Sequence, residues 1–297
     1  MNEQGTIYGG VLCALGYIFL AVMSGASKYL QEISGIPAIE ITFFSYFFVL
    51  LASLPWIFMT GPANLFKSPY IHLVLTRTFL GTLTYYLYFI TVDSMPLVTA
   101  VTLINTAPFW VALLAAILLG ERVGKAALGF IAAGFTGVVM VIGPTSRGMN
   151  ARSVLLALLV GVLAASVIVC RRSLKDESWQ RTVAVYSLLA TLLTGIAMAP
   201  SFTMPSGWEW IFVACIGACM YAMQALVQLA ARYARASTLG PISYASIVAS
   251  GMIGWLVWGH VPTLLETAGI LLIIASGVVI LLSEKRRVSA PADNNAG

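Results

Sequence analysis

The sequence predicts an all-α integral membrane protein of ten transmembrane helices, arranged as two inverted five-helix repeats. Three observations predict this fold: a composition poor in charge, a succession of apolar segments long enough to cross a bilayer, and the distribution of basic residues between those segments. The 297 residues are 60% hydrophobic and 9% charged, whereas soluble domains carry about 25% charged residues. Water therefore cannot be the solvent for most of the protein surface.

Ten apolar segments have the length that a bilayer requires. A hydrocarbon core about 30 Å thick needs roughly 20 apolar residues per helix, and short breaks rich in Gly, Pro or polar residues separate the segments. The first segment has no basic region before it and no Ala-x-Ala site after it, which predicts a retained helix and not a cleaved signal peptide. The predicted spans are 7–29, 37–58, 70–92, 96–119, 124–142, 153–171, 182–200, 208–231, 237–259 and 264–283.

Basic residues concentrate on one side of these spans. With both termini cytoplasmic, twelve Lys and Arg residues fall in inner segments and three, Lys28, Arg147 and Arg152, fall in outer ones. This bias is typical of bacterial inner-membrane proteins, whose cytoplasmic loops are rich in Lys and Arg. The net charge of +5 does not indicate nucleic-acid binding, because the basic residues lie in separate loops. The inner residues are Lys67, Arg122, Lys125, Arg171, Arg172, Lys175, Arg181, Arg232, Arg235, Lys285, Arg286 and Arg287.

The two halves of the chain share a glycine pattern. Gly129 and Gly137 in the fifth span match Gly269 and Gly277 in the tenth at a constant offset of 140 residues. Because each repeat has an odd number of spans, five, the two copies insert in the membrane in opposite orientations, which is the layout of many secondary transporters. The alternative is that glycines recur by chance in lipid-facing helices. The predicted divisions are a first repeat at 1–146, a second at 147–284 and a disordered cytoplasmic tail at 285–297.

Several motifs resemble the EamA module of the drug/metabolite transporter superfamily, over residues 7–283. The resemblance implies a ten-helix fold with a central cavity lined by the third, fourth, eighth and ninth helices, and transport of small organic molecules. The sequence departs from the family pattern at Ser45 and His260, where many members carry arginine and glutamate, which leaves the substrate subgroup open. The motifs are Arg77 to Gly81, Met95-Pro96-Leu97, Ala100, Asn105 to Pro108 and Leu118 to Arg122 in the first half, and Ala236-Ser237, Pro241, Tyr244, Gly254-Trp255, Gly259, Pro262 and Gly269 in the second.

Arg77 is the basic residue that lies well inside a predicted span. A charge in a bilayer costs at least about 2.5–3.5 kcal/mol on insertion scales, so it requires a reason. Its planar guanidinium suits a carboxylate of an anionic or zwitterionic substrate. The alternative is that Arg77 caps carbonyl groups of a neighbouring helix or pairs with a loop acid.

Uncharged polar residues in the middle of the spans complete the predicted substrate cavity. They fall at helical spacing on single faces, and buried glutamines without partners would be costly, so these faces should meet another helix or a wet cavity. The alternative is that they only join helices through hydrogen bonds. The cavity residues are Arg77, Thr84, Tyr85 and Tyr88 on the third span, Asn105 and Trp110 on the fourth, Tyr221, Gln224 and Gln228 on the eighth, and Ser243 and Tyr244 on the ninth.

Glu40 lies near the outer end of the second span. We expect it to form an interfacial ion pair with Lys28, and the alternative is a role in proton coupling. Two isolated histidines and four cysteines outside any CxxC motif predict neither an enzyme nor a metal or redox site. No cofactor is expected.

These patterns together predict a secondary transporter of the bacterial inner membrane that moves small polar metabolites by alternating access. Efflux of amino acids or amino-acid-like compounds is expected, and import of a vitamin or nucleotide-like metabolite is the alternative. A channel or a membrane enzyme is less favoured. The expected partners are a small-molecule substrate and the lipid bilayer, without nucleic acid, for a monomer or homodimer.

The charge distribution predicts that the C-terminus is cytoplasmic. A reporter that works only in the cytoplasm should therefore be active when it is fused after Leu282, and a reporter that works only in the periplasm should be inactive there. Paired phosphatase and fluorescent-protein fusions measure this directly. Periplasmic activity at that position would contradict both the ten-span topology and the inverted repeat.

Overall fold

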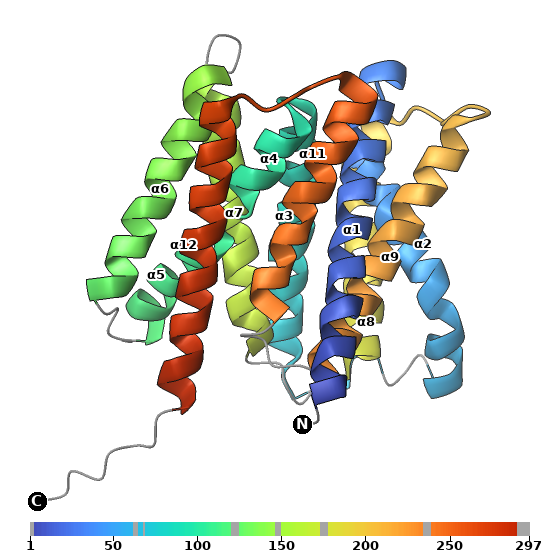
Figure 1. Ribbon diagram of the computed structural model, residues 1–297. Coiled ribbons are helices and arrows are strands. Elements are labelled where there is room, and N and C mark those ends of the chain that lie inside the picture. The colour runs from blue at the N-terminus through green and yellow to red at the C-terminus, as the bar shows by residue number, and fades with distance from the viewer. Residues whose placement is uncertain are drawn as a thin grey trace, which may run out of the picture.

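The computed structural model describes residues 3–61, 65–67, 69–119, 125–145, 150–172, 178–233 and 239–289. In these ranges the chain is helical and contains no strand (Figure 1). Two short 3₁₀ helices, η2 (Ala199–Ser201) and η3 (Gly240–Tyr244), accompany the α-helices. The α-helices are α1 (Glu3–Ser34), α2 (Ala38–Thr60), α3 (Ile71–Asp93), α4 (Leu97–Ile104), α5 (Ala107–Leu119), α6 (Lys125–Thr145), α7 (Ala151–Arg172), α8 (Trp179–Met198), α9 (Glu209–Tyr233), α11 (Ala245–Trp258) and α12 (Leu264–Ser289).

The described helices cross the bundle ten times, because α4 continues into α5 and η3 continues into α11 (Figure 1). Six of the crossings are long and apolar enough to span a membrane by length and composition. The other four contain shorter apolar helices, Leu97–Val111, Gly129–Gly143, Ile242–Trp258 and Leu264–Val279. The number of helical crossings agrees with the ten predicted spans, and six of them have the length and composition of a membrane span. The end of the bundle where α1 begins and α12 ends is called the base, and the opposite end the top.

The fourth span is not the single helix predicted for 96–119. It breaks at Asn105 and Thr106, between α4 and α5. Pro108 has no N–H to donate and its ring crowds the carbonyl four residues earlier, so the helical ladder cannot continue through this point. Thr106 instead donates its N–H to Leu103 O at 3.2 Å. The break lies within the bundle, between two apolar half-helices.

Gly259 ends the ninth span, as the sequence predicts. Its φ of 66° lies in the left-handed region that side chains rarely adopt, and its N–H donates to Trp255 O at 2.9 Å. The bond from Gly259 is that of an αL cap, and His260 N–H adds a second bond, to Gly254 O at 3.2 Å. The tenth span then begins with a capping box, in which Thr263 and Glu266 exchange bonds between side chain and backbone at 2.7 and 3.2 Å.

The last helix runs further than predicted. α12 continues to Ser289, so the expected tail boundary at residue 285 falls inside a helix. The remaining tail residues, 290–297, lie outside the described part of the chain. The charged residues near the end of α12 therefore follow its apolar segment within the same helix.

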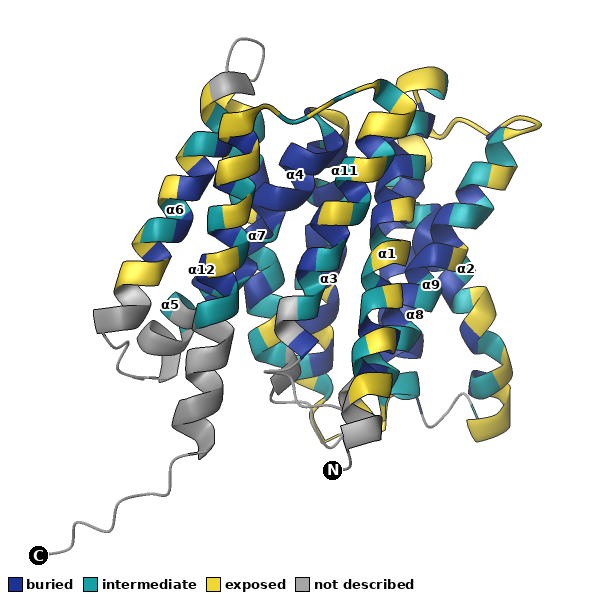
Figure 2. Ribbon diagram, in the orientation of Figure 1, coloured by how far each residue is buried: buried dark blue, intermediate teal, exposed yellow. Residues whose placement is uncertain are grey.

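The outward faces of the bundle are apolar. Large hydrophobic side chains such as Leu264, Met59 and Ile196 are 92%, 86% and 75% exposed, and exposed positions follow the outer faces of the helices (Figure 2). Inside, one cluster runs through most helices and includes the fully buried Tyr46 and Phe89. An apolar surface of this extent fits a lipid solvent.

Glycines bring α6 and α12 into backbone contact. A Cβ on Gly137 would lie 2.8 Å from Gly269 O, and a Cβ on Gly269 would lie 2.7 Å from Gly137 O. Lipid offers no hydrophobic drive for helix association, so close backbone approach at small residues supplies the packing energy. The glycine pattern seen in the sequence therefore includes a helix-packing contact.

The change Gly269→Ala should destabilise the protein by about 1–3 kcal/mol, because the added methyl group overlaps a rigid carbonyl. Gly129→Ala is the matched control, since nothing lies within 4 Å of a Cβ there. Thermal unfolding in detergent measures both variants. Similar melting temperatures for the two would show that the α6–α12 contact is not as tight as described.

Candidate substrate site

Two tyrosines from different halves of the chain meet in the interior. The hydroxyl groups of Tyr46 on α2 and Tyr186 on α8 are hydrogen-bonded, and their rings lie edge to face with centroids 4.9 Å apart. Gly81 on α3 makes room for them, because a Cβ there would lie 2.5 Å from Tyr186 Oη. Both rings are buried. The pair joins α2, α3 and α8 at one point.

Arg77 lies against this pair. It is 2% exposed, and its Cζ is 5.4 Å from the centre of the Tyr186 ring. A guanidinium over an aromatic face is attracted by the ring's negative face, more strongly where water is excluded. Arg77 therefore reaches into the bundle from α3 and does not extend along the surface to water.

The other predicted residues of α3 continue the aromatic contacts. The ring of Tyr85 lies 6.1 Å from that of Tyr46 and 6.1 Å from that of Tyr88. Tyr88 shares a 2.5 Å hydrogen bond with Ser24 of α1, whereas Thr84 donates to its own helix, to Leu80 O at 2.6 Å. Arg77, Tyr85 and Tyr88 therefore belong to one connected group, here called the tyrosine–arginine cluster, with Tyr46 and Tyr186.

The break in the fourth span forms a second polar group. Asn105 donates to Val101 O at 2.7 Å and to Ser246 Oγ of α11 at 3.3 Å. Ser246 in turn donates to Ser243 O at 2.7 Å. Trp110 Nε1 donates to Thr106 Oγ1 at 3.2 Å. The structure thus connects Asn105 of the fourth span with Ser243 of the ninth, whereas Trp110 bonds within its own span.

Tyr244 packs differently from its neighbour in sequence. It is buried, and its hydroxyl lies where a Cβ of Gly277 on α12 would be. That oxygen has no hydrogen-bond partner among the described residues. Tyr244 therefore fills the space between η3 and α12.

The polar residues of α9 stand apart from both groups. Gln224 is 6% exposed, and its buried Nε2 has no hydrogen-bond partner in the described part of the chain. Tyr221 and Gln228 are half-buried. Helices α3 and α9 both pack on α1 and α2, and neither is a principal neighbour of the other.

Residue pattern alone did not identify Tyr46, Tyr186, Ser24 and Ser246 as members of these groups. The signal for the first two was present: they are 140 residues apart, the offset that relates the glycines of the two halves. Applying this offset to all polar residues would have paired them. Ser24 and Ser246 carry no comparable signal, because serines are common in membrane helices.

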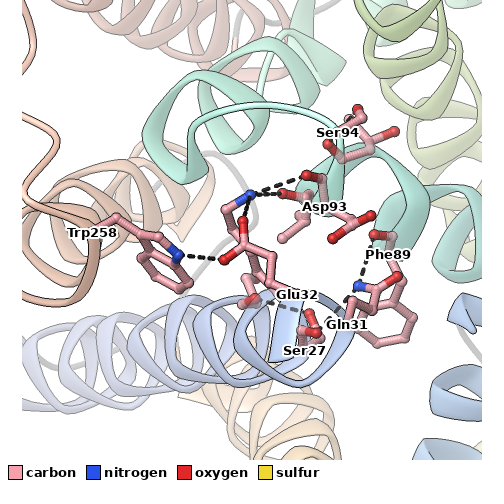
Figure 3. A network of polar contacts seen from close by, with 11 residues as sticks. Ser27, Gln31, Glu32, Phe89, Asp93, Ser94 and Trp258 are labelled. Carbon is pink, nitrogen blue, oxygen red and sulfur yellow. Dashed lines mark hydrogen bonds and ion pairs between the residues drawn. The ribbon is translucent and has the colours of Figure 1, made fainter. Parts of the chain in front are cut away.

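A charged network links three helices at the top of the bundle (Figure 3). Lys28 Nζ lies 2.9 Å from Glu32 Oε1 and donates to the carbonyl groups of Val92 and Asp93 at 3.2 and 3.0 Å. Trp258 Nε1 donates to Glu32 Oε2 at 2.5 Å. The expected ion pair between Lys28 and Glu40 is therefore wrong, because the ammonium group is held by the helical neighbour of Lys28 and by the end of α3.

Comparison with known proteins adds the family. The profile of the EamA-like transporter family matches the chain twice, over residues 7–143 and 151–282. A crystal structure described only as that of a protein superimposes with a TM-score of 0.68 and 18% sequence identity, covering 98% of this chain and 100% of the other. That likeness shows a shared fold.

Three relatives are named as transporters. The riboflavin transporter of Rhizobium johnstonii is 28% identical over 294 residues, 98% of this chain and 97% of that protein. The pseudopaline exporter CntI of Pseudomonas aeruginosa is 28% identical over 279 residues, 93% and 97% of the two chains. The S-adenosylmethionine uptake transporter of Rickettsia felis is 23% identical over 296 residues, 97% and 98%.

The family profile covers nearly the whole chain, and the apolar helices that it matches are those of a multi-pass membrane protein. The relatives transport small molecules and are not enzymes. The chain belongs to the EamA-like transporter family of the drug/metabolite transporter superfamily, and it is a membrane transporter of small metabolites.

Proposed function

We propose that this protein is a secondary transporter that carries small polar metabolites containing a planar ring across the bacterial inner membrane by alternating access. The tyrosine–arginine cluster supports this proposal most directly. Half-buried Tyr85 can offer its ring to a ligand, while the buried Tyr46, itself hydrogen-bonded to Tyr186, packs against it. Aromatic side chains stack on planar rings. A relative named as a riboflavin transporter agrees with a ring-bearing substrate.

The cavity would lie between α3 and α9. These two helices pack on common neighbours and are not principal neighbours of each other, and both carry predicted cavity residues. The unpartnered Nε2 of Gln224 supports a wet site over a purely structural hydrogen bond. Thr84, Tyr221 and Gln228 complete the two facing sides, and the Asn105–Ser246 contact, with Trp110, Ser243 and Tyr244, borders the proposed cavity.

Two inverted five-helix repeats are part of the proposal. The packing partners correspond when the halves are exchanged: α1 packs on α9 as α7 packs on α3, and α2 packs on α8. α1 starts at the base and α7 at the top (Figure 1). Tyr46 and Tyr186, 140 residues apart, meet where a two-fold axis between the halves would pass. The family profile also matches each half separately.

Alternating access would use the interrupted helices. Transporters with inverted repeats commonly place discontinuous helices at the substrate site near the bilayer midplane. Here the α4–α5 break and the 3₁₀ start of the ninth span supply such interruptions. The distribution of basic residues supports an inner-membrane location with both termini, and hence the base, in the cytoplasm.

A second candidate substrate class is amino-acid-like, with efflux as the direction. Arg77 favours it, because a guanidinium is well suited to a carboxylate. The two candidates differ in what Arg77 recognises. A carboxylate would form an ion pair with it, whereas an uncharged ring system would need only its stacking surface.

Gln224→Leu should lower riboflavin counterflow in proteoliposomes several-fold while the melting temperature stays nearly unchanged. If Gln224 faces a wet cavity, the change removes one hydrogen bond to the substrate, worth on the order of 1 kcal/mol, and no bond between helices. Val248→Ala is the control, since Val248 is 61% exposed on the outer face of α11. A strongly lowered melting temperature with intact flux would show that Gln224 only joins helices.

Arg77→Lys and Arg77→Gln separate charge from geometry. If Arg77 binds a carboxylate, the lysine variant should keep part of the flux and the glutamine variant should lose most of it, selectively for acidic or zwitterionic substrates. Flux normalised to folded protein is measured for an amino acid and its methyl ester. Equal losses for the two compounds would reject recognition of a carboxylate and assign Arg77 a structural role.

A further inference from the structure

The charge of Arg77 lies on an aromatic ring that comes from the other half of the chain. Arg77 is on α3, and its Cζ is 5.4 Å from the centre of the Tyr186 ring on α8. Both side chains are buried, at 2% and 4% exposure. The sequence did not place α8 around the expected cavity. A helix outside that set therefore contributes the surface on which the guanidinium lies.

Packing fixes the ring of Tyr186 from two further sides. The ring of Tyr46 on α2 lies edge to face with it, at an interplanar angle of 68°, and the two hydroxyl groups are hydrogen-bonded. On the α3 side, a Cβ on Gly81 would lie 2.9 Å from Tyr186 Cζ, so the backbone of α3 is close to the ring. The ring cannot turn away from Arg77 unless α2 or α3 moves.

Arg77 has an alternative position at the surface, which the ring opposes. It lies six residues into α3, so its Cα is about 9 Å from the base end of the helix at 1.5 Å per residue. An arginine at this depth can extend along the helix and place its charge in interfacial water. Burial of the charge inside a membrane protein is costly unless a partner holds it. The attraction of a guanidinium to an aromatic face is strongest where water is excluded, so Tyr186 favours the buried position.

The second half of the chain does not repeat this charge. The residue 140 positions after Arg77 is Gly217 on α9. A Cβ on Gly217 would overlap the Cβ of Phe48 on α2, so there is no room for a longer side chain. Further along α9, Gln224 and Gln228 offer neutral amides instead. The two sides of the proposed cavity therefore differ in charge, which would orient a substrate that has one anionic and one neutral end.

We propose that Tyr186 is a positioning residue that holds Arg77 inside the bundle, where the guanidinium binds a carboxylate on a ring-bearing substrate. This inference rests on the proposed substrate site between α3 and α9. A guanidinium that lies over a ring still donates N–H bonds in its own plane, and a carboxylate can accept two of them. Tyr186 acts through Arg77 and needs no contact with the substrate. It thereby sets the preference of the site for acidic over neutral ring compounds.

Chemical labelling tests the position of Arg77 without any substrate. Phenylglyoxal, which reacts with accessible guanidinium groups, is added to the full-length protein in lipid nanodiscs. Mass spectrometry then gives the reaction rate at Arg77 relative to that at the exposed Arg152. Tyr186→Leu should raise this relative rate on the order of tenfold, as expected for the loss of a desolvated cation–π contact. Tyr186→Phe keeps the ring and should keep the rate low. An unchanged rate in Tyr186→Leu would overturn the proposal.

Transport selectivity tests whether this position serves recognition. Counterflow of phenylalanine and of phenylalanine methyl ester is measured in proteoliposomes, with leakage through protein-free liposomes subtracted. Tyr186→Leu should raise the half-saturation concentration for phenylalanine on the order of tenfold and leave that for the ester nearly unchanged. Tyr186→Phe should restore the preference for phenylalanine. Equal losses for the two compounds in Tyr186→Leu would reject a role in recognition and leave only a packing role.

Phe109→Leu is the matched control for the loss of a buried ring. Phe109 is 0% exposed on α5, which is not a principal neighbour of α3. The change should lower the melting temperature but leave the labelling rate of Arg77 and the preference for phenylalanine unchanged. Faster labelling of Arg77 in this variant as well would indicate general loosening and overturn the proposal. If the unchanged protein carries neither compound, the proposed substrate class fails on that result, and the labelling still decides whether Tyr186 positions Arg77.

Discussion

The structure depends on one constraint: in a bilayer core, every backbone N–H and C=O must find its partner within the protein. Continuous helices meet it along most of the chain. The break between α4 and α5 is the difficult place, and α7 covers it. A Cβ on Gly161 would lie 3.3 Å from Ile104 O and 3.1 Å from Thr106 Oγ1, so the α7 backbone lies directly against the interruption. Asn105 supplies a further donor, to Val101 O. The interruption is tolerated because it faces protein and not lipid.

The same constraint explains where polar side chains gather. Many Ser and Thr hydroxyls donate to the carbonyl four residues earlier and so need no other helix, as Thr84 and Ser45 do. Groups that cannot bond locally meet at the centre, where Tyr46 bonds to Tyr186 and Arg77 lies over the ring of Tyr186. These central contacts connect α2, α3 and α8. The fold therefore holds these polar groups in place.

The two ends of the bundle are closed by different chemistry. At the base, contacts between α1 and the second half are aromatic or weakly polar: the rings of Tyr8 and Tyr233 lie 5.0 Å apart, and Cys13 Sγ lies 3.7 Å from Leu239 O. At the top, the contacts carry charge, through Glu32 to Trp258 and through Glu40 to Thr203. The second half of the chain is therefore joined to α1 and α2 by different kinds of contact at the two ends.

Apolar length, loop charge and turn residues determined the number of spans, most of their boundaries and the membrane environment, because these properties act within about 20 residues of chain. The α4–α5 break was also encoded locally, in Pro108. Helix partners, in contrast, were decided by the tertiary structure, since periodicity shows that a face is polar but not which helix it meets. Lys28 illustrates this limit: its pair with Glu32 is a local contact one turn along α1, whereas only the packing of α1 against α3 brought it to the carbonyl groups of Val92 and Asp93. For the same reason, the sequence pattern identified Arg77, Tyr85 and Tyr88 as candidate site residues but not their partners. Only the packing of α8 against α2 brought Tyr186 to Tyr46, and only the tertiary structure brought Thr203 to Glu40.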